Sequence, residues 1–289
     1  MRYHYTSAVE TLQREDFSEI VRLALEEDCP AEDITSVAIF SPEVKCSARL
    51  ISREPGILCG IPVLNEINLQ SGNVLELNTF IAEGKSFCAG DIILQIRGNL
   101  LDVLRLERLI LNFLQYLSGI ATQTAELVNS YPGIYILDTR KTLPGYRKMV
   151  KYAVFCGGGS NHRIHLSDMA MIKDNHVAMA GSMKQAVEKI RSRFPGKKVE
   201  LEIDSLAQLT EAMDAEPDIL LLDNFSIQDT REAVHQVQQK KASILIECSG
   251  GITPDKLAEL SRIGGIGVSM GYLTHTTRFL DLSLDLEKD

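Results

Sequence analysis

Apolar runs alternate with helical stretches over the second half of the chain. Six such runs follow one another from Tyr135 onward, and they read IYILD, MAMIKD, KVELEID, DILLLD, SILIECSGG and GIGVSMG. Repeated strand-then-helix units predict a parallel sheet with helices outside it, either doubly wound or closed into a barrel. Six units are fewer than the eight of a complete barrel, so an incomplete barrel is expected as one form of the sheet.

The first part of the chain has a different pattern. Apolar positions at helical spacing predict a helix over Val9 to Glu27, and mixed strands and turns follow to about Gly98, as in a small α+β domain. Leu100 to Ser130 predicts a long helix that is apolar around nearly its whole circumference and broken near Ser118-Gly119. Such a helix must be buried on several sides.

Charged and polar residues stand at or just past the carboxyl ends of the predicted strands. In a barrel these ends form one face, where the loops converge and where the chemistry takes place. A single Asp at such a place more often only terminates a strand, but the repetition favours a functional site. The residues are Asp138, Arg140, Lys173, Glu202, Asp204, Asp223, Glu247 and Ser269.

Positive charge is concentrated in one segment of an acidic chain. The 289 residues carry a net charge of -9, whereas the segment 138–176 carries seven Lys or Arg against three acids. This balance disfavours general nucleic-acid binding and indicates a site for a small polyanion. No apolar run approaches the ~20 residues needed to span a bilayer, and the start lacks the apolar stretch of a signal peptide. A cytoplasmic protein without membrane contact is therefore expected.

Six cysteines lie far apart in the sequence, without CxxC or Cys/His metal spacing. In a chain of this size they are expected to be reduced and mostly buried. Cys248 stands beside a predicted phosphate loop, but no base partner is in view and a nucleophilic role is disfavoured.

Glycine-rich turns follow the last two predicted strands, in ECSGGI and SMGYLTH. Glycine lets backbone N–H groups approach a phosphate, and the last two βα loops of barrels frequently form a phosphate site. The segment FCGGGSNHR predicts a loop that comes close to a ligand or to another strand. It does not match the nucleotide-binding P-loop pattern.

The predicted face at the carboxyl ends of the strands, called the mouth below, combines carboxylates with cations. Glu202 and Asp223 end adjacent strands, and they either hold Mg²⁺ between themselves and phosphate oxygens or form salt bridges; both alternatives stay open. Arg140, Arg163 and Lys173 come from different turns, and such a set fits a small molecule with two carboxylates. Other candidates for orienting a ligand are His162 and His176, although a lone His is more often a packed or surface residue.

Several motifs together resemble those of the quinolinate phosphoribosyltransferase family. The motifs are ERLILNFLQYLSGIAT, DTRKTLPGYR, KYAV, GGGSNHR, IKDNH, LLLDNF, ECSGGI and SMGYLTHT, in this order, with EEDCPAEDITS near the start. The resemblance covers nearly the whole chain. It implies the type II phosphoribosyltransferase fold, an N-terminal α/β sandwich domain over 1–112 with 276–289 packed on it, and an incomplete, seven-stranded α/β barrel over 113–275.

The resemblance also implies an activity: phosphoribosyl transfer from phosphoribosyl pyrophosphate to quinolinate with Mg²⁺, giving nicotinate mononucleotide, pyrophosphate and CO₂ in NAD biosynthesis. It implies a homodimer with shared active sites. The residues implied for quinolinate are Arg108 (from the neighbouring subunit), Thr139, Arg140, His162, Arg163 and Lys173. Those implied for the phosphates are Lys141, Ser249, Gly250, Gly251, Ser269, Gly271 and His275, and Glu202 and Asp223 would hold the metal through water.

Two alternatives remain beside this activity. One is a related protein of the same architecture that acts on another small acid, because His165 stands where the family usually has Gly and Tyr272 where it usually has Ala. The other is a non-catalytic sensor that binds a phosphate ligand. Retention of Arg140, Arg163 and Lys173 speaks against the first, and a carboxylate pair beside Lys141 is more than binding alone requires.

Overall fold

The computed structural model describes residues 8–287. Its contacts divide the chain into two compact units. The first consists mainly of 126–141 and 159–272, and the second of 9–125, 142–158 and 273–289. The domain boundary expected near residue 112 stays a prediction.

The first unit contains a parallel sheet made from the six predicted apolar runs. The strand order is β6-β11-β10-β9-β8-β7, and a single parallel bridge of Ser160 to Leu137 extends it beyond β6. Among the described residues β6 and β7 do not pair with each other, so the sheet stays open and the predicted incomplete barrel is confirmed. The strands are β6 (Tyr135–Leu137), β7 (Ala170–Ile172), β8 (Val199–Ile203), β9 (Ile219–Asp223), β10 (Leu245–Ser249) and β11 (Gly267–Ser269).

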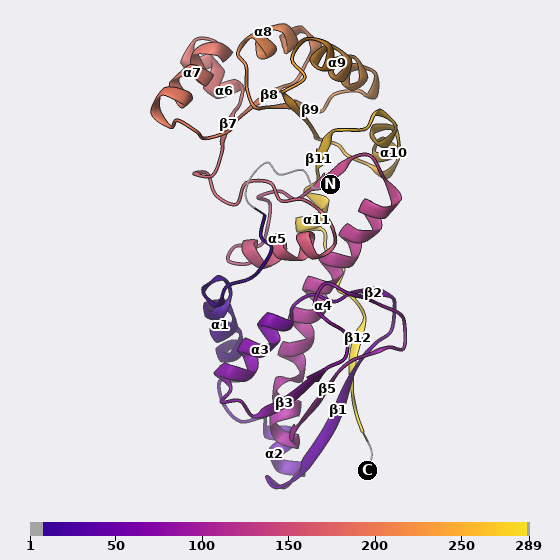
Figure 1. The fold of residues 1–289 in the computed structure, drawn as a ribbon. Helices are drawn as coiled ribbons and strands as arrows, with labels where there is room; N and C mark the ends of the chain where they lie inside the picture. The colour runs from indigo at the N-terminus through magenta and orange to yellow at the C-terminus, as the bar shows by residue number, and fades with distance from the viewer. Residues whose placement is uncertain (1–7, 288–289) are drawn as a thin grey trace. The chain divides into compact units, whose positions relative to one another are not determined.

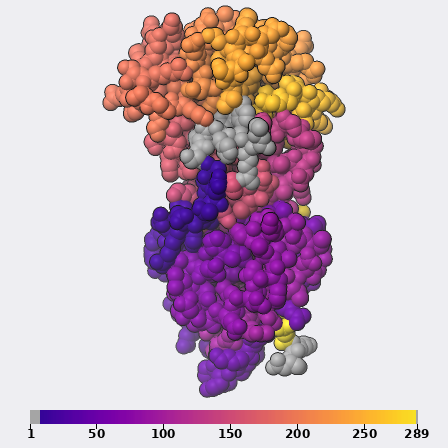
Figure 2. Space-filling model, in the orientation of Figure 1, coloured from indigo at the N-terminus to yellow at the C-terminus, as the bar shows by residue number. Residues whose placement is uncertain are grey.

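Helices follow the strands and form an outer arc around them (Figure 1). Polar side chains cap several: Ser182 accepts from the N–H of Gln185, and Thr253 accepts from that of Lys256. In Figure 2 the side chains of α7 to α9, salmon to orange, form one continuous surface. The helices are α6 (Asp174–Ala180), α7 (Met183–Arg193), α8 (Leu209–Asp214, after a 3₁₀ turn at Leu206–Gln208), α9 (Ile227–Lys240) and α10 (Pro254–Ile263). The short helix α11 (Tyr272–His275) belongs to the second unit from Leu273 onward.

The second unit is built on an antiparallel sheet of order β12-β1-β5-β3, with a two-stranded ribbon of β2 and β4. Helices α1 and α3 pack on each other, and α3 begins with Pro at its first turn, where no N–H is needed. The elements are β1 (Lys45–Ser52), β2 (Gly56–Ile57), β3 (Leu75–Thr79), β4 (Ser86–Phe87), β5 (Ile92–Asn99), β12 (Leu282–Leu286), α1 (Ser18–Asp28), α2 (Ile34–Ile39), α3 (Ile61–Gln70) and α5 (Arg147–Cys156).

The long helix α4 (Leu100–Ser130) is continuous, so the predicted break near Ser118-Gly119 is wrong. Gly119 serves packing instead, because a Cβ at this position would collide with the carbonyl oxygen of Arg278. The hydroxyl of Ser118 bonds to the backbone of Cys59. The prediction of burial on several sides is confirmed, since all residues from Leu109 to Ala121 except Asn112 and Gln115 are buried.

The predicted opening helix was too long. The described chain has no helix before a 3₁₀ turn at Arg14–Asp16, and α1 begins only at Ser18. Phe17 separates the 3₁₀ turn from α1, because its φ of -144° is not helical. The Asp16 carboxylate accepts a hydrogen bond from the N–H of Gln13, as in a capping box.

The six cysteines are thiols outside any disulfide, as expected, but only Cys59 and Cys248 are buried, so the expectation of mostly buried cysteines was wrong. Burial raises the pKa of Cys248 to about 12, which makes a nucleophilic thiolate unfavourable there. In the part of the chain that the structure describes, no helix combines the length and the apolar character needed to cross a membrane.

Candidate active site

Two cationic side chains at the predicted mouth have buried donors without acceptors. The Nε atoms of Arg140 and Arg163 are both buried and have no hydrogen-bond partner among the described residues. Arg163 donates through Nη1 to the Met169 carbonyl, 3.0 Å away, which fixes its orientation. Burial and the neighbouring charge of Arg140 lower the pKa of Arg163. Two guanidinium groups that repel each other and whose Nε donors lack acceptors fit an anion.

The predicted lysine and carboxylates also lie at strand ends of this unit. Lys173 Nζ pairs with Glu202 Oε2 at 2.8 Å, so one of the two alternatives, a salt bridge, is present for Glu202. Asp223 accepts instead from the side-chain amide of Asn224 at 2.8 Å. Each of these contacts uses one carboxylate oxygen, and strands β8 and β9 pair directly. The carboxylates therefore fit a hard cation such as Mg²⁺ in donor chemistry.

A buried group of three side chains was not predicted from the sequence. Glu247, expected at the carboxyl end of its strand, lies in the middle of β10 instead. His162 Nε2 lies 3.1 Å from Glu200 Oε2 and 3.6 Å from Glu247 Oε2, and all three side chains are buried. Their ligand-type atoms lie within 4.8 Å of one another, close enough to hold a metal ion. The signal in the sequence was a glutamate in the middle of each of two apolar strands, VELEI and LIECS.

The two glutamates favour their protonated forms. Burial and, after it, the neighbouring charge of Glu200 raise the pKa of Glu247 to about 8. Burial also raises the pKa of Glu200, to about 7. A pair of adjacent carboxyl groups in a dry interior avoids a double negative charge by keeping a proton.

Asp138, at the end of β6, anchors the loop that carries His162. Its carboxylate accepts from the backbone N–H of His162 at 2.8 Å and from the amide of Asn161 at 2.6 Å. The predicted close approach of the glycine segment to a strand is confirmed, because its Ser160 forms a parallel bridge with Leu137 of β6. The segment also approaches a helix, since a Cβ on Gly157 would collide with the Ala121 carbonyl of α4.

The predicted phosphate loop after β10 has the expected backbone. Gly250 and Gly251 both have positive φ, 80° and 54°, and a Cβ on Gly250 would collide with Asn224. Helix α10 begins directly after this loop at Pro254, so its first N–H groups follow the glycines. Ser269 ends β11 and is buried.

The remaining predicted residues have varied positions. Thr139 Oγ1 accepts from the N–H of the exposed Lys141. His176 Nδ1 accepts from the N–H of Lys173 and so caps α6. His165 and Tyr272 are exposed, Gly271 is partly buried, and Arg108 and His275, both exposed, belong to the second unit.

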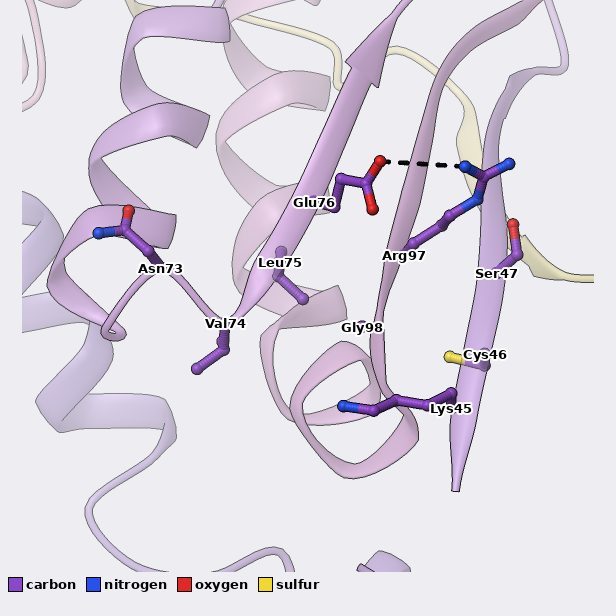
Figure 3. Close-up of a pocket in the computed structure, with 9 residues that line it drawn as sticks. All are labelled: Lys45, Cys46, Ser47, Asn73, Val74, Leu75, Glu76, Arg97 and Gly98. Atoms are coloured by element: carbon purple, nitrogen blue, oxygen red, sulfur yellow. Dashed lines mark ion pairs between the residues drawn. The ribbon is translucent and has the colours of Figure 1, made fainter. Parts of the chain in front are cut away.

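A hollow of about 620 Å³ in the second unit contains none of the predicted site residues. It lies over β1, β3 and β5, where Glu76 Oε1 and Arg97 Nη1 stand 3.9 Å apart across the strands (Figure 3). The Glu76–Arg97 pair carries no net charge and so adds no positive charge to the hollow, whereas Arg140 and Arg163 together carry two positive charges.

An open α/β barrel with two unpaired arginine Nε donors and a glycine loop at its mouth has the features of a protein that binds a small anionic ligand. The model of the quinolinate phosphoribosyl transferase C-terminal domain matches residues 120–285, and that of the N-terminal domain matches 33–118. The chain belongs to the quinolinate phosphoribosyltransferase family.

Relatives agree over nearly the full length. The chain is 38% identical to the carboxylating nicotinate-nucleotide pyrophosphorylase of Mycobacterium leprae, over 92% of this chain and 95% of the relative. It is 39% identical to the probable enzyme of the same name from Bacillus subtilis, over 90% of each. The solved nicotinate-nucleotide pyrophosphorylase of Francisella tularensis has a TM-score of 0.92, 36% identity and coverage of 98% of this chain and 100% of that one.

Proposed function

We propose that this chain is a pentosyltransferase that moves the phosphoribosyl group of phosphoribosyl pyrophosphate to the ring nitrogen of quinolinate. The products are nicotinate mononucleotide, pyrophosphate and CO₂, as an enzyme of NAD biosynthesis would form them. The observation that carries the proposal is the pair of buried Nε donors, those of Arg140 and Arg163, which have no acceptor among the described residues. A planar dicarboxylate supplies such acceptors in a matching geometry.

The residues of the mouth bind and orient the two substrates. Arg140 and Arg163 hold the quinolinate carboxylates, and Lys173 leaves its pairing with Glu202 to join them. Thr139 and His162 stand beside this set on the same two loops. The loop of Ser249, Gly250 and Gly251 binds the 5-phosphate through backbone N–H groups, together with Ser269, Gly271 and His275.

Chemistry is then mainly positioning. The C–O bond to pyrophosphate breaks as the ring nitrogen forms its bond to the ribose carbon, and holding the two atoms close and in line removes much of the entropic barrier. Lys141 stabilises the charge that develops on the pyrophosphate. The cationic ring then takes the electrons of its adjacent carboxylate, CO₂ leaves, and a proton from solvent replaces it. A dry mouth favours the loss of CO₂, because a carboxylate that water solvates loses CO₂ less readily.

Mg²⁺ belongs to the proposal as a cofactor at Glu202 and Asp223. Both side chains are only partly buried, and both end adjacent strands. Glu202 and Asp223 would hold the ion through water, and it would supply positive charge near the pyrophosphate. We also propose a cytoplasmic homodimer in which the exposed Arg108 reaches the quinolinate site of the neighbouring subunit.

The test is product formation by the purified protein from phosphoribosyl pyrophosphate and Mg²⁺, with quinolinate in one reaction and nicotinate in another. Nicotinate mononucleotide and CO₂ from quinolinate alone are expected. Binding of phosphoribosyl pyrophosphate without product from either acid would contradict the activity and favour the related protein with another substrate, or the sensor.

A further inference from the structure

A second group of side chains with metal-ligand chemistry lies in the second unit, outside the proposed active site. Cys59 Sγ, a carboxylate oxygen of Glu83 and Cys156 Sγ all lie within 4.8 Å of one another. Cys59 directly precedes the turn into α3, Glu83 stands in the turn before β4, and Cys156 is the last residue of α5. The sequence gives no warning of this group, because its members are 24 and 73 positions apart.

The backbone around the group is held in place without any ligand. Cys59 donates its N–H to Ser118 Oγ at 3.0 Å, and its carbonyl accepts from the same hydroxyl at 3.2 Å. The Glu83 carboxylate accepts the N–H groups of Gly60 at 2.8 Å and Ile61 at 3.0 Å. Hydrogen bonds of this kind orient the ligating atoms of metal sites and maintain their geometry.

The spacing fits a tetrahedral cation. Zn–S bonds of about 2.3 Å and Zn–O bonds of about 2.0–2.2 Å place the ligands of one tetrahedron roughly 3.5–3.8 Å apart. The three atoms lie within 4.8 Å of one another, so side-chain rotations can bring them to this spacing. Tyr152 hydrogen-bonds to both Glu83 and Cys156, which makes it a partner for a water molecule in the fourth position.

The chemistry of the donors selects the ion. Two sulfur atoms and one oxygen favour zinc over Mg²⁺ or Ca²⁺, which take oxygen ligands. Burial raises the pKa of Cys59 and that of Glu83. A divalent ion would bind the thiolates and release two thiol protons.

We propose that Cys59, Glu83 and Cys156 form a structural zinc site that ties α3 and α5 together. The site is independent of the proposed phosphoribosyl transfer, and its role is to stabilise the second unit.

The test uses the full-length protein, reduced, stripped of metal with a chelator and then titrated with Co²⁺ and Zn²⁺. One equivalent of Co²⁺ is expected to give the near-ultraviolet charge-transfer absorption of cobalt–thiolate bonds, and one equivalent of Zn²⁺ to abolish it. Carboxylates such as Glu202 and Asp223 can bind Co²⁺ but cannot produce this absorption, so the signal reports Cys59 and Cys156. Zinc is also expected to raise the melting temperature.

Two variants sharpen the result. Cys156→Ser, at a partly exposed position, is expected to lose the absorption, to bind zinc about 100-fold more weakly and to melt at a temperature that zinc does not change. Cys88→Ser, which alters an exposed cysteine outside the group, is expected to behave as the wild type: it keeps the absorption, the zinc affinity and the rise in melting temperature with zinc. A folded wild-type protein without the charge-transfer band at saturating Co²⁺ would overturn the proposal, and so would a band that persists in Cys156→Ser.

Discussion

Arg140 makes the clearest prediction at the scale of single residues. Arg140→Ala removes a charged donor that has no acceptor in the free protein, and kcat/KM for quinolinate is expected to fall by about 100-fold or more. Steady-state kinetics of CO₂ release measures this. Arg140→Lys should recover only part of the loss, because a point charge cannot replace the planar fork.

The matched control is Arg231→Ala, since Arg231 is an exposed arginine on α9 of the same unit. Its kinetics are expected to equal those of the wild type. Equal kinetics in Arg140→Ala would refute the assignment of the dicarboxylate site.

The raised pKa of Glu247 leads us to expect that the stability of the folded protein depends on pH. Its pKa rises from 4.5 to about 8 on folding because of burial, so the folded state holds its proton more tightly than the unfolded state does. This contribution is fully present below about pH 4.5 and is lost as the pH rises toward 8, at up to about 1.4 kcal/mol per pH unit. Glu247→Gln removes this contribution. Urea unfolding should therefore show that the free energy of unfolding of the variant rises relative to that of the wild type between pH 5 and pH 8. Parallel stability curves would contradict this.

Single residues also show where sequence-based prediction ends. Arg140, Lys173, Glu202 and Asp223 could be predicted because charge at the end of an apolar run is visible in the sequence. The contact of His162 with Glu200 and Glu247 could not, because it depends on which strands neighbour one another and which face each side chain takes.

At the scale of elements, the parallel strands were the predictable part. Each of the six apolar runs became a strand, since burial on both faces of a parallel sheet requires continuous apolar sequence. The glycine in α4 was misinterpreted for a physical reason: glycine weakens a helix and also permits close packing, and only the position of the Arg278 carbonyl separates the two.

Gly119 therefore makes a prediction for helix α4. Gly119→Ala improves helix propensity by nearly 1 kcal/mol, yet it places a methyl group against the Arg278 carbonyl, so a net destabilisation of about 1–3 kcal/mol is expected. Thermal unfolding measures it. Asn112→Ala, at an exposed position of the same helix, should change stability by no more than about 0.5 kcal/mol, and a Gly119→Ala protein as stable as this control would disprove the packing role.

At the scale of the whole molecule, the proposed shared sites can be tested by mixing. Arg108→Ala and Lys173→Ala are each expected to be inactive alone. After the two variants are dissociated and reassociated together, half of the dimers are mixed and each has one intact site. Activity should return to roughly a quarter of the wild-type value. A mixture no more active than its components would place Arg108 and Lys173 in the same subunit's site.

The pairing of β12 with β1 has a consequence for synthesis on the ribosome. The two strands are about 230 residues apart in the chain and pair over Ala48 to Ser52. At a translation rate of about 5–20 residues per second, one edge of β1 has no partner strand for roughly 10–50 s, until β12 is synthesised. Throughout that interval the N–H and C=O groups of this edge are open to strands of other nascent chains, so the growing chain needs protection there until β12 has been synthesised.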